Sequence, residues 1–495
     1  MERSVKPVDA LNAGDVAVSS GHAGYCDQPP YDPSEAYPEY AFANATVRDP
    51  NAAYQAVREV LHLLGLDALR YGTPHWNPLG ELVSPGQTIV VKPNFVRDFR
   101  ETHAGHDDCL ITHGAIIRAV VDYAHLALAG RGRIVIADAP QNDADFAHVA
   151  RIAALGELQA FYRREAGFSI EVVDLRPETA RKIDGVIVGH EPQPGDPAGF
   201  VKVDLDGASS FAEVEHLCHL LYGAEYDKDE LRSHHTEGRH EYLVSRTVME
   251  ADLVINLPKL KTHKKTGLTA CLKNLVGING NKNWLPHHRE GSPAEGGDEF
   301  PGMTLTRRLE RRAVGCFKRV FPRLGPLRSL LAGPLKSVGK KAFGDTNAGT
   351  IRSGNWRGND TTWRMVHDLN RILIYADAEG CLHRHPVRRV LHLVDAIVAG
   401  EGNGPLDATP KVCGAVLAGR NPVAVDLVCA AMMGFRPPYP PVVSRAFGKH
   451  PLPLVDFALD DVTVVSEDSG LNGPLTRRQF ADRFRLHFGW EDHAR

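Results

Sequence analysis

The first strong indication of fold class is the sequence TIVVKPN at residues 88–94, an apolar β-branched run that follows a Pro-Gly pair. A short continuous run of this kind predicts a buried strand. Apolar residues recur at helical spacing before it, at 52–64, and after it, at 115–128, and a second strand pattern, RIVIADAP, occupies 133–140. Parallel neighbours need a crossover connection, so this order of elements predicts an α/β fold.

Further apolar runs extend the α/β prediction along the chain, at residues 170–175, 252–257, 391–394, 414–418 and 462–465. We expect two lobes of mostly parallel sheet flanked by helices. The predicted divisions are an irregular N-terminal arm over 1–52, a first lobe over 53–250, a second lobe over 251–470 and a helical tail over 471–495. Ligands of such sheets bind beyond the carboxyl ends of the strands, which is where a site is expected.

Composition and charge describe an ordinary globular protein. The 495 residues, 43% hydrophobic and 24% charged, are enough for two or three domains with full cores. The formal net charge of −4 offers no overall attraction for nucleic acid, so no nucleic-acid partner is expected. The 8 cysteines show no C-x-x-C spacing, which predicts no iron–sulfur cluster and favours reduced thiols in the cytoplasm. The N-terminus lacks the apolar core of a secretory signal, and no apolar run is long enough to span a bilayer.

Residues 283–358 interrupt the α/β pattern, and we interpret them as an insertion. Between Arg307 and Lys341 there are 11 Lys or Arg residues against one acid, with Leu, Phe and Val interleaved. This composition suits either a lid over an acidic substrate or a peripheral contact with anionic lipid, where each basic residue contributes about 1 kcal/mol. Both interpretations of residues 307–341 stay open.

The segment richest in reactive side chains is LPKLKTHKKTGLTACLKNLVGING, at residues 257–280. Lysines, a histidine and glycine-containing turns directly follow a predicted strand, so cations and amide donors gather where the chain leaves the sheet. An anionic ligand suits such a place. A solvated basic loop before a helix is the simpler alternative, but it does not explain Lys273 and Asn274, which follow an apolar stretch.

We therefore predict an enzyme that acts on a small anionic metabolite or saccharide carrying a carboxylate or phosphate. The predicted catalytic residues are His263 as proton donor or acceptor, Glu401 as its counterpart, and Lys273. The predicted substrate-binding residues are Lys92, Asn94, Lys259, Lys261, Thr269, Asn274 and Asn403. Grouped cations stabilise a developing oxyanion, which favours proton transfer of the racemase, epimerase or lyase type. The alternative from another class is a non-catalytic binder of anionic or lipid-linked ligands at a membrane surface.

A second group of side chains has the residue types that bind a divalent metal, namely His103, His106, Asp107 and His113. Exposed histidines of an ordinary loop explain the same residues in a protein with 24 histidines. His113 also precedes a predicted helix and is placed to cap it or to hold an anion at its N-terminus. A divalent metal is thus a candidate cofactor, and the sequence indicates neither its identity nor the oligomeric state.

Several motifs resemble the signature of the domain of unknown function 362 family. The resemblance rests on LPKLKTH at 257–263, followed by Thr269 and by KNLVG at 273–277. Other motifs agree with it, namely VKPN at 91–94, IAD at 136–138, VDAI at 394–397, EGNGP at 401–405 and NPVAVD at 421–426. Many members of that family carry a cysteine-rich ferredoxin-like module, which this chain lacks. The resemblance implies a fold more than a reaction.

The same segment is more distantly similar to the lactate racemase family. That family has a strand leading to a histidine, a glycine-rich turn and, ten positions later, a lysine that serves a tethered nickel-pincer nucleotide. His263 and Lys273 share that spacing. This chain departs from the pattern at Cys271 and Leu272, where the lactate racemase family has two glycines, so the similarity implies a shared fold and does not establish a shared cofactor.

Overall fold

A computed structural model describes residues 14–42, 45–47, 50–100, 108–183, 186–223, 227–304, 307, 349–478, 480 and 483–493. Two groups of predicted functional residues lie outside this described part. They are the candidate metal ligands His103, His106 and Asp107, and the basic stretch 307–341 beyond its first residue.

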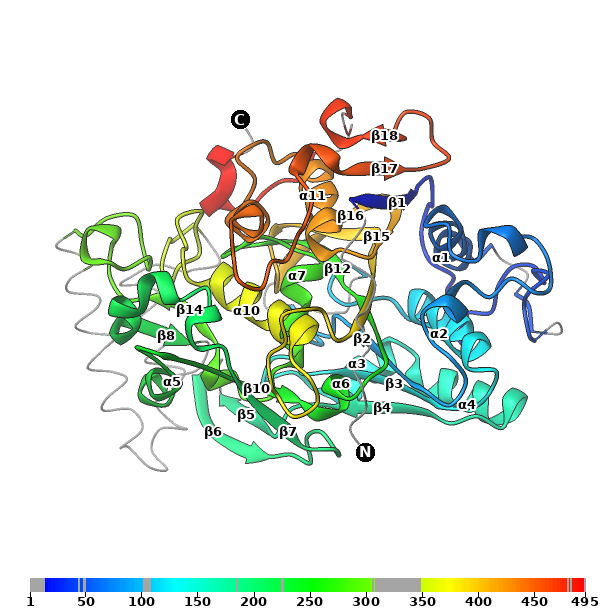
Figure 1. Ribbon diagram of the computed structural model, residues 1–495, viewed down its shortest axis with the longest axis horizontal. Coiled ribbons are helices and arrows are strands. Elements are labelled where there is room, and N and C mark those ends of the chain that lie inside the picture. The colour runs from blue at the N-terminus through cyan, green and yellow to red at the C-terminus, as the bar shows by residue number, and fades with distance from the viewer. Residues whose placement is uncertain are drawn as a thin grey trace.

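One mixed sheet organises the described part of the chain (Figure 1). Its strand order is β18 (Gly473–Pro474), β17 (Thr463–Val465), β1 (Asp15–Ser19), β16 (Asp407–Gly419), β15 (Arg389–Asn403), β11 (Leu253–Leu257), β2 (Thr88–Pro93), β3 (Arg133–Asp138) and β4 (Ile170–Asp174). From β15 to β4, neighbouring strands run parallel. Beside β15 lies β12 (Lys259–His263), which pairs in turn with β13 (Gly267–Thr269). The predicted α/β fold with a mostly parallel sheet is confirmed.

Alternate residues of the strands supply two separate cores, one on each face of the sheet. Ile89 and Val91 of β2 join the core formed with α1 (Ala52–Leu63), α2 (Gly114–Leu128) and α4 (Leu155–Ala166). Val90 joins the core that includes α10 (Thr362–Tyr375) and α11 (Pro422–Met432). Figure 1 shows α1, α2 and α4 gathered away from α10 and α11. Both faces are covered, which explains why these strands read as continuous apolar runs.

Smaller elements complete the described part. The remaining α-helices are α3 (Phe146–Ile152), α5 (Lys228–His234), α6 (Arg246–Met249), α7 (Cys271–Asn274) and α12 (Pro441–Ser444). Three small antiparallel sheets are also present. In the first, β10 (Arg239–Ser245) lies between β7 (Phe200–Asp204) and β9 (His235–Thr236). In the other two, β8 (Leu221–Gly223) pairs with β14 (Pro286–Arg289), and β5 (Glu178–Ile183) pairs with β6 (Val186–Pro192).

The structure differs from the predicted division of the chain at three places. A single sheet crosses the expected lobe boundary at residue 250, because β11 pairs with β2 on one side and with β15 on the other. The expected irregular arm contains β1, whose buried residues lie between β16 and β17. The described residues of the expected helical tail form β18 and short 3-10 turns instead of an α-helix. The pairing partners of β11, and those of β1, lie more than a hundred residues away in the sequence, so local pattern did not reveal them.

No helix of the described residues combines the length and the apolar character that a membrane crossing requires.

Candidate functional site

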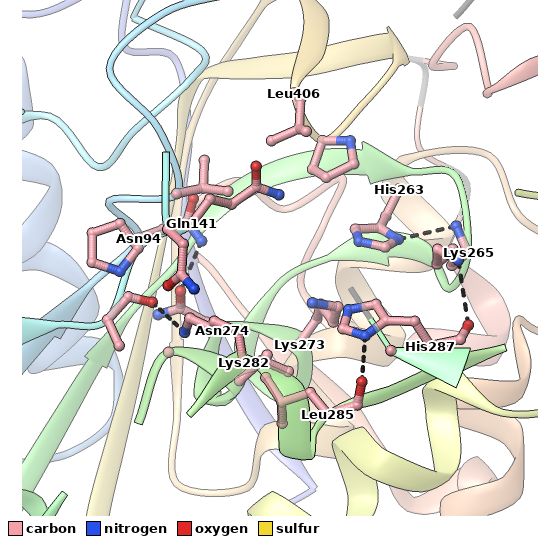
Figure 2. A pocket seen from close by; sticks show the side chains of 18 of the residues that line it. Asn94, Gln141, His263, Lys265, Lys273, Asn274, Lys282, Leu285, His287 and Leu406 are labelled. Carbon is pink, nitrogen blue, oxygen red and sulfur yellow. Dashed lines mark hydrogen bonds between the residues drawn. The ribbon is translucent and has the colours of Figure 1, made fainter. Parts of the chain in front are cut away.

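A cavity of about 400 Å³ lies where β2 and β3 end and where β12 leaves the sheet. Figure 2 shows Asn94 and Asn274 at one end of it, and His263, Lys265, Lys273 and His287 at the other. The carboxyl ends of parallel strands meet at one edge of a sheet, which brings residues distant in sequence to this place.

Lys92 and Asp138 form a buried ion pair in the cavity wall. Lys92 Nζ lies 2.7 Å from Asp138 Oδ1, and Asp138 Oδ2 accepts a hydrogen bond of 2.7 Å from the Phe95 backbone N–H. Burial lowers the pKa of Lys92, and the charge of Asp138 opposes that effect. The pair joins the ends of β2 and β3 and adds no net charge to the cavity.

Gly277 has no side chain, and the Lys92–Asp138 ion pair occupies the space that a side chain would fill. A Cβ atom at that position would lie 2.0 Å from Asp138 Oδ1 and 2.7 Å from Lys92 Nζ. We predict that Gly277→Ala displaces the pair and lowers the free energy of unfolding by about 1–3 kcal/mol, measured by urea denaturation. The control is Gly156→Ala in α4, where a Cβ meets nothing within 4 Å. Equal stabilities of the two variants would contradict the prediction.

Asn94 and Asn274 are held in the wall by a chain of buried hydrogen bonds. Asn94 Nδ2 donates to Asn274 Oδ1 at 2.8 Å, and Asn274 Nδ2 donates to Asn256 Oδ1 at 2.7 Å. Behind them, Lys261 Nζ donates to Asn94 Oδ1 at 2.8 Å and to the Leu110 carbonyl at 2.6 Å. Burial lowers the pKa of Lys261 to about 7. Lys261 thus orients Asn94 from beneath, whereas the sequence predicted direct substrate binding.

The imidazole ring of His263 is held in one tautomer. Its Nδ1 accepts hydrogen bonds from the backbone N–H groups of Lys265, at 3.1 Å, and Thr266, at 3.2 Å. Nδ1 therefore carries no proton, and the proton of the neutral ring resides on Nε2. Burial, together with the charges of Lys273 and Lys264, holds the pKa of His263 well below 6.5. The ring is neutral and offers an N–H donor to the cavity.

His287 of β14 lines the same cavity and has the opposite tautomer. Its Nδ1 lies 2.8 Å from the Leu285 carbonyl oxygen, which only accepts, so Nδ1 donates and Nε2 keeps its lone pair. Burial, then the charges of Lys265 and Lys273, holds the pKa of His287 well below 6.5. Sequence analysis missed this residue, because it lies in the predicted insertion. In the sequence, His287 appears only as part of a His-His pair after a tryptophan and a proline, and this pattern has no spacing that would indicate a catalytic residue.

Lys273 differs from two other lysines of the cavity wall in its contacts. Lys265 and Lys282 donate to backbone carbonyl oxygens, and burial lowers the pKa of each to about 7. Lys273 Nζ has no hydrogen-bond partner among the described residues, and burial, then the charge of Lys92, lowers its pKa to about 8. Asp426 fixes the short helix α7 that carries Lys273 by accepting hydrogen bonds from the first N–H groups of that helix.

Positive charge exceeds negative charge around the cavity. The carboxylate of Asp138 is matched by Lys92, and that of Asp143 is matched by Arg97. Within the described residues, Lys265, Lys273 and Lys282 form no ion pair with a carboxylate. An anionic ligand would supply the missing negative charge, and a group with hydrogen-bond acceptors suits these donors.

Two predicted substrate-binding residues of β12 and β13 lie outside the cavity wall. Lys259 Nζ is 2.7 Å from Asp395 Oδ2, and both side chains are 0% exposed. Tyr25 completes this network by donating to Asp395 and accepting from Lys259. The Thr269 hydroxyl is buried, and Thr269 pairs with Lys261 across the two strands. Neither Lys259 nor Thr269 lines the cavity.

The two predicted residues of the β15–β16 hairpin, Glu401 and Asn403, are also absent from the cavity lining. The Glu401 carboxylate accepts a hydrogen bond of 3.0 Å from the Arg485 backbone N–H, and Asn403 lies at the end of β15 opposite Asp407. The turn that follows, with Pro405 and Leu406, forms the cavity wall. The hairpin therefore contributes apolar surface to the cavity and no acid.

His113, the one candidate metal ligand in the described part, caps α2. Its Nδ1 accepts a hydrogen bond of 3.1 Å from the Ala115 backbone N–H, and its ring stacks on Tyr25 at a centroid distance of 3.9 Å. Across the described ranges, no three His, Cys, Asp or Glu side chains are grouped in a way that could hold a metal ion.

Residues 207–431 match the model of a family described as Domain of unknown function (DUF362). The matched part, called the DUF362 segment here, covers less than half of the chain. The DUF362 segment supplies the cavity wall from Tyr222 to Leu406, including His263, Lys273 and His287. Lys92, Asn94 and Asp138 come from the part of the chain before it. No curated protein matches the chain. The resemblance to this family is confirmed, and the more distant similarity to the lactate racemase family stays a prediction.

Proposed function

We propose that this protein is an enzyme that moves a proton at a carbon atom of a small anionic substrate, in a reaction of the racemase, epimerase or lyase type. The observation that supports the proposal is the pair of opposite tautomers. His287 offers a lone pair and His263 offers an N–H to one cavity. A base and a hydrogen-bond donor are the two groups that proton abstraction next to a carbonyl or carboxylate needs.

Each side chain then has a distinct role in the proposed reaction. His287 Nε2 accepts the proton from carbon, since it keeps a lone pair. Neutral His263 donates a hydrogen bond to the oxygen on which negative charge develops, and a neutral imidazole can polarise a carbonyl in this way. Lys265 and Lys273 balance the charge of the substrate. His287 thereby takes the role that the sequence suggested for Glu401.

Anion binding should depend on pH because these lysines titrate near neutrality. Burial lowers the pKa of Lys265 to about 7 and that of Lys273 to about 8. A bound anion stabilises the protonated forms, so binding takes up protons, and the affinity falls as pH rises from about 6 to about 9.

Calorimetric titration with sulfate, in buffers of different ionisation enthalpy, measures both the affinity and the proton uptake. Sulfate is suitable because it does not itself titrate in this range. The variant Lys449→Gln, which removes an exposed lysine, should leave the titration unchanged. A sulfate affinity that is independent of pH would speak against the cavity as the anion site.

The test of the enzymatic proposal is hydrogen exchange. The purified protein is incubated in D₂O with a panel of hydroxy acids, oxo acids and sugar acids, and loss of C–H signals is followed by NMR. We expect exchange at the carbon next to the carboxylate or carbonyl group of the substrate. Tight binding of an anion without exchange of any panel member would favour the alternative, a non-catalytic binder of anionic ligands.

A divalent metal is the second proposal, and one residue supports it. His287 donates from Nδ1 to a carbonyl and keeps Nε2 free, which is the arrangement of metal-binding histidines. His263 does not suit this role, because its Nδ1 faces two N–H donors and its Nε2 holds the proton. Metal analysis of the purified protein, with and without the change His287→Gln, tests this second proposal.

A cytoplasmic location is also proposed, on the evidence of the thiols. Cys26, Cys109, Cys218, Cys271 and Cys429 are free and buried, and Cys381 is free and exposed. Free cysteines are the usual state in a reducing compartment.

A further inference from the structure

We propose that Lys273 forms an imine with the carbonyl group of its substrate, which is an aldehyde or ketone that also carries a carboxylate or phosphate. This inference rests on the proposed function and names the substrate class.

The first argument is the freedom of the Lys273 side chain. The ammonium groups of Lys265 and Lys282 are directed at backbone carbonyl oxygens, which hold them in place. Lys92 is directed at Asp138. Lys273 Nζ lines the same cavity and has no such bond among the described residues, so no interaction has to break before its nitrogen attacks a ligand.

The second argument is that hydrogen bonds fix the backbone of α7, the short helix that carries Lys273. Asp426 accepts hydrogen bonds from the N–H groups of Cys271, at 2.6 Å, and Leu272, at 3.1 Å. Asn274, which follows Lys273 in the sequence, forms hydrogen bonds with Asn94 and Asn256. A side chain that is unbound at its tip and fixed at its base is suited to nucleophilic attack.

The third argument is the chemistry of the neighbouring groups. A lysine acts as a nucleophile only as the free amine, and burial beside another cation favours that form. Burial and Lys92 lower the pKa of Lys273 to about 8, so about a tenth of the side chain is the free amine at pH 7. His287 is present as a base and His263 as a donor to the carbonyl oxygen.

The proposed step balances without an oxidant or reductant. The nitrogen lone pair forms a bond to the carbonyl carbon while the C–O π bond breaks toward oxygen. Starting from the ammonium form, nitrogen loses two protons and the oxygen gains two, by way of His287 and His263. Water leaves, and a protonated imine remains. The protonated imine withdraws electrons from the adjacent carbon, which assists the proton abstraction proposed above.

Reductive trapping tests the inference directly. The full-length protein is incubated separately with glyoxylate, pyruvate, pyridoxal phosphate and glyceraldehyde 3-phosphate, each followed by sodium borohydride. Hydride reduction converts an imine to a stable secondary amine, which intact mass and peptide mapping locate. We expect one adduct, on Lys273, and the probe that forms it at the lowest concentration shows whether the carboxylate or the phosphate class is preferred.

The control compares Lys273 with a lysine outside the cavity. Lys273→Arg keeps the positive charge and should lose the adduct, whereas Lys449→Arg, at an exposed position, should keep it. Circular dichroism shows whether each variant is folded, and the mapping of the wild-type protein does not depend on any variant. Adducts spread over exposed lysines, or an adduct that persists in Lys273→Arg, would overturn the inference.

Reductive trapping and hydrogen exchange together distinguish a failure of the imine inference from a failure of the proposed function. Hydrogen exchange in D₂O without a trapped adduct would leave the proton-transfer enzyme standing and remove the imine. A trapped adduct on Lys273 without hydrogen exchange would support imine formation and count against the racemase, epimerase or lyase reaction.

Discussion

Replacing Lys259 by methionine is expected to lower the free energy of unfolding by about 3–5 kcal/mol, the usual cost of leaving one member of a buried ion pair without its partner. Lys259 and Asp395 are both 0% exposed, and their charged atoms are 2.7 Å apart. Methionine fills most of the same volume but leaves the Asp395 carboxylate with hydrogen-bond donors only, from Tyr25 and the His113 backbone. The prediction therefore treats Lys259 as a structural residue.

Urea denaturation measures the effect, and a second ion pair provides the control. Lys202 and Glu241 are also 2.7 Å apart, but the Lys202 side chain is 57% exposed. Lys202→Met should cost no more than about 1 kcal/mol, as exposed pairs do. The double change Lys259→Met with Asp395→Leu removes both charges and should recover much of the loss. Equal effects of Lys259→Met and Lys202→Met would be incompatible with this prediction.

The second large effect is expected on chemistry. His287→Gln should slow hydrogen exchange into the substrate by about 100- to 10,000-fold, the usual contribution of a positioned acid or base. Glutamine keeps a polar side chain of similar length but has no basic nitrogen. Sulfate binding should change little, because the lysines that attract the anion remain.

Two further variants show whether the effect belongs to His287. His75→Gln, at an exposed position of the chain, should leave the exchange rate unchanged. Glu401→Gln should also have little effect, since its carboxylate lies at the Arg485 backbone outside the cavity wall. A large loss in Glu401→Gln together with a normal rate in His287→Gln would restore the role that sequence analysis gave to Glu401.

The strands and helices near the site were predictable because their patterns are local. Residues 88–93 form β2, and residues 133–138 form β3, within the apolar runs that predicted them. The carboxyl ends of parallel strands share one edge, so the expectation that Lys92 and Asn94 approach the segment after residue 257 followed from fold class alone. The structure places both in one cavity with His263 and Lys273.

The exposure of individual side chains was not predictable in the same way. Lys259, Lys261 and His263 occupy alternate positions of β12, but only His263 lines the cavity. Lys259 meets Asp395 of β15, a partner more than a hundred residues away. The ion pair with Asp395 decides that Lys259 is the lysine whose charge is neutralised inside the protein. Residue spacing within 257–280 gives no information about this distant partner.

By itself, the sequence determined the class of fold, the strand that leads to the site and the concentration of cations after it, since these depend on residue types and on periodicities of a few residues. Only the tertiary structure decided that His287 joins His263, that their tautomers are opposite, and that Lys273 lacks a hydrogen-bond partner among the described residues. The physical reason is that a tautomer or an unpaired amine is set by the carbonyl and N–H groups within about 3 Å of it. Those groups come from segments that only the folded chain brings together.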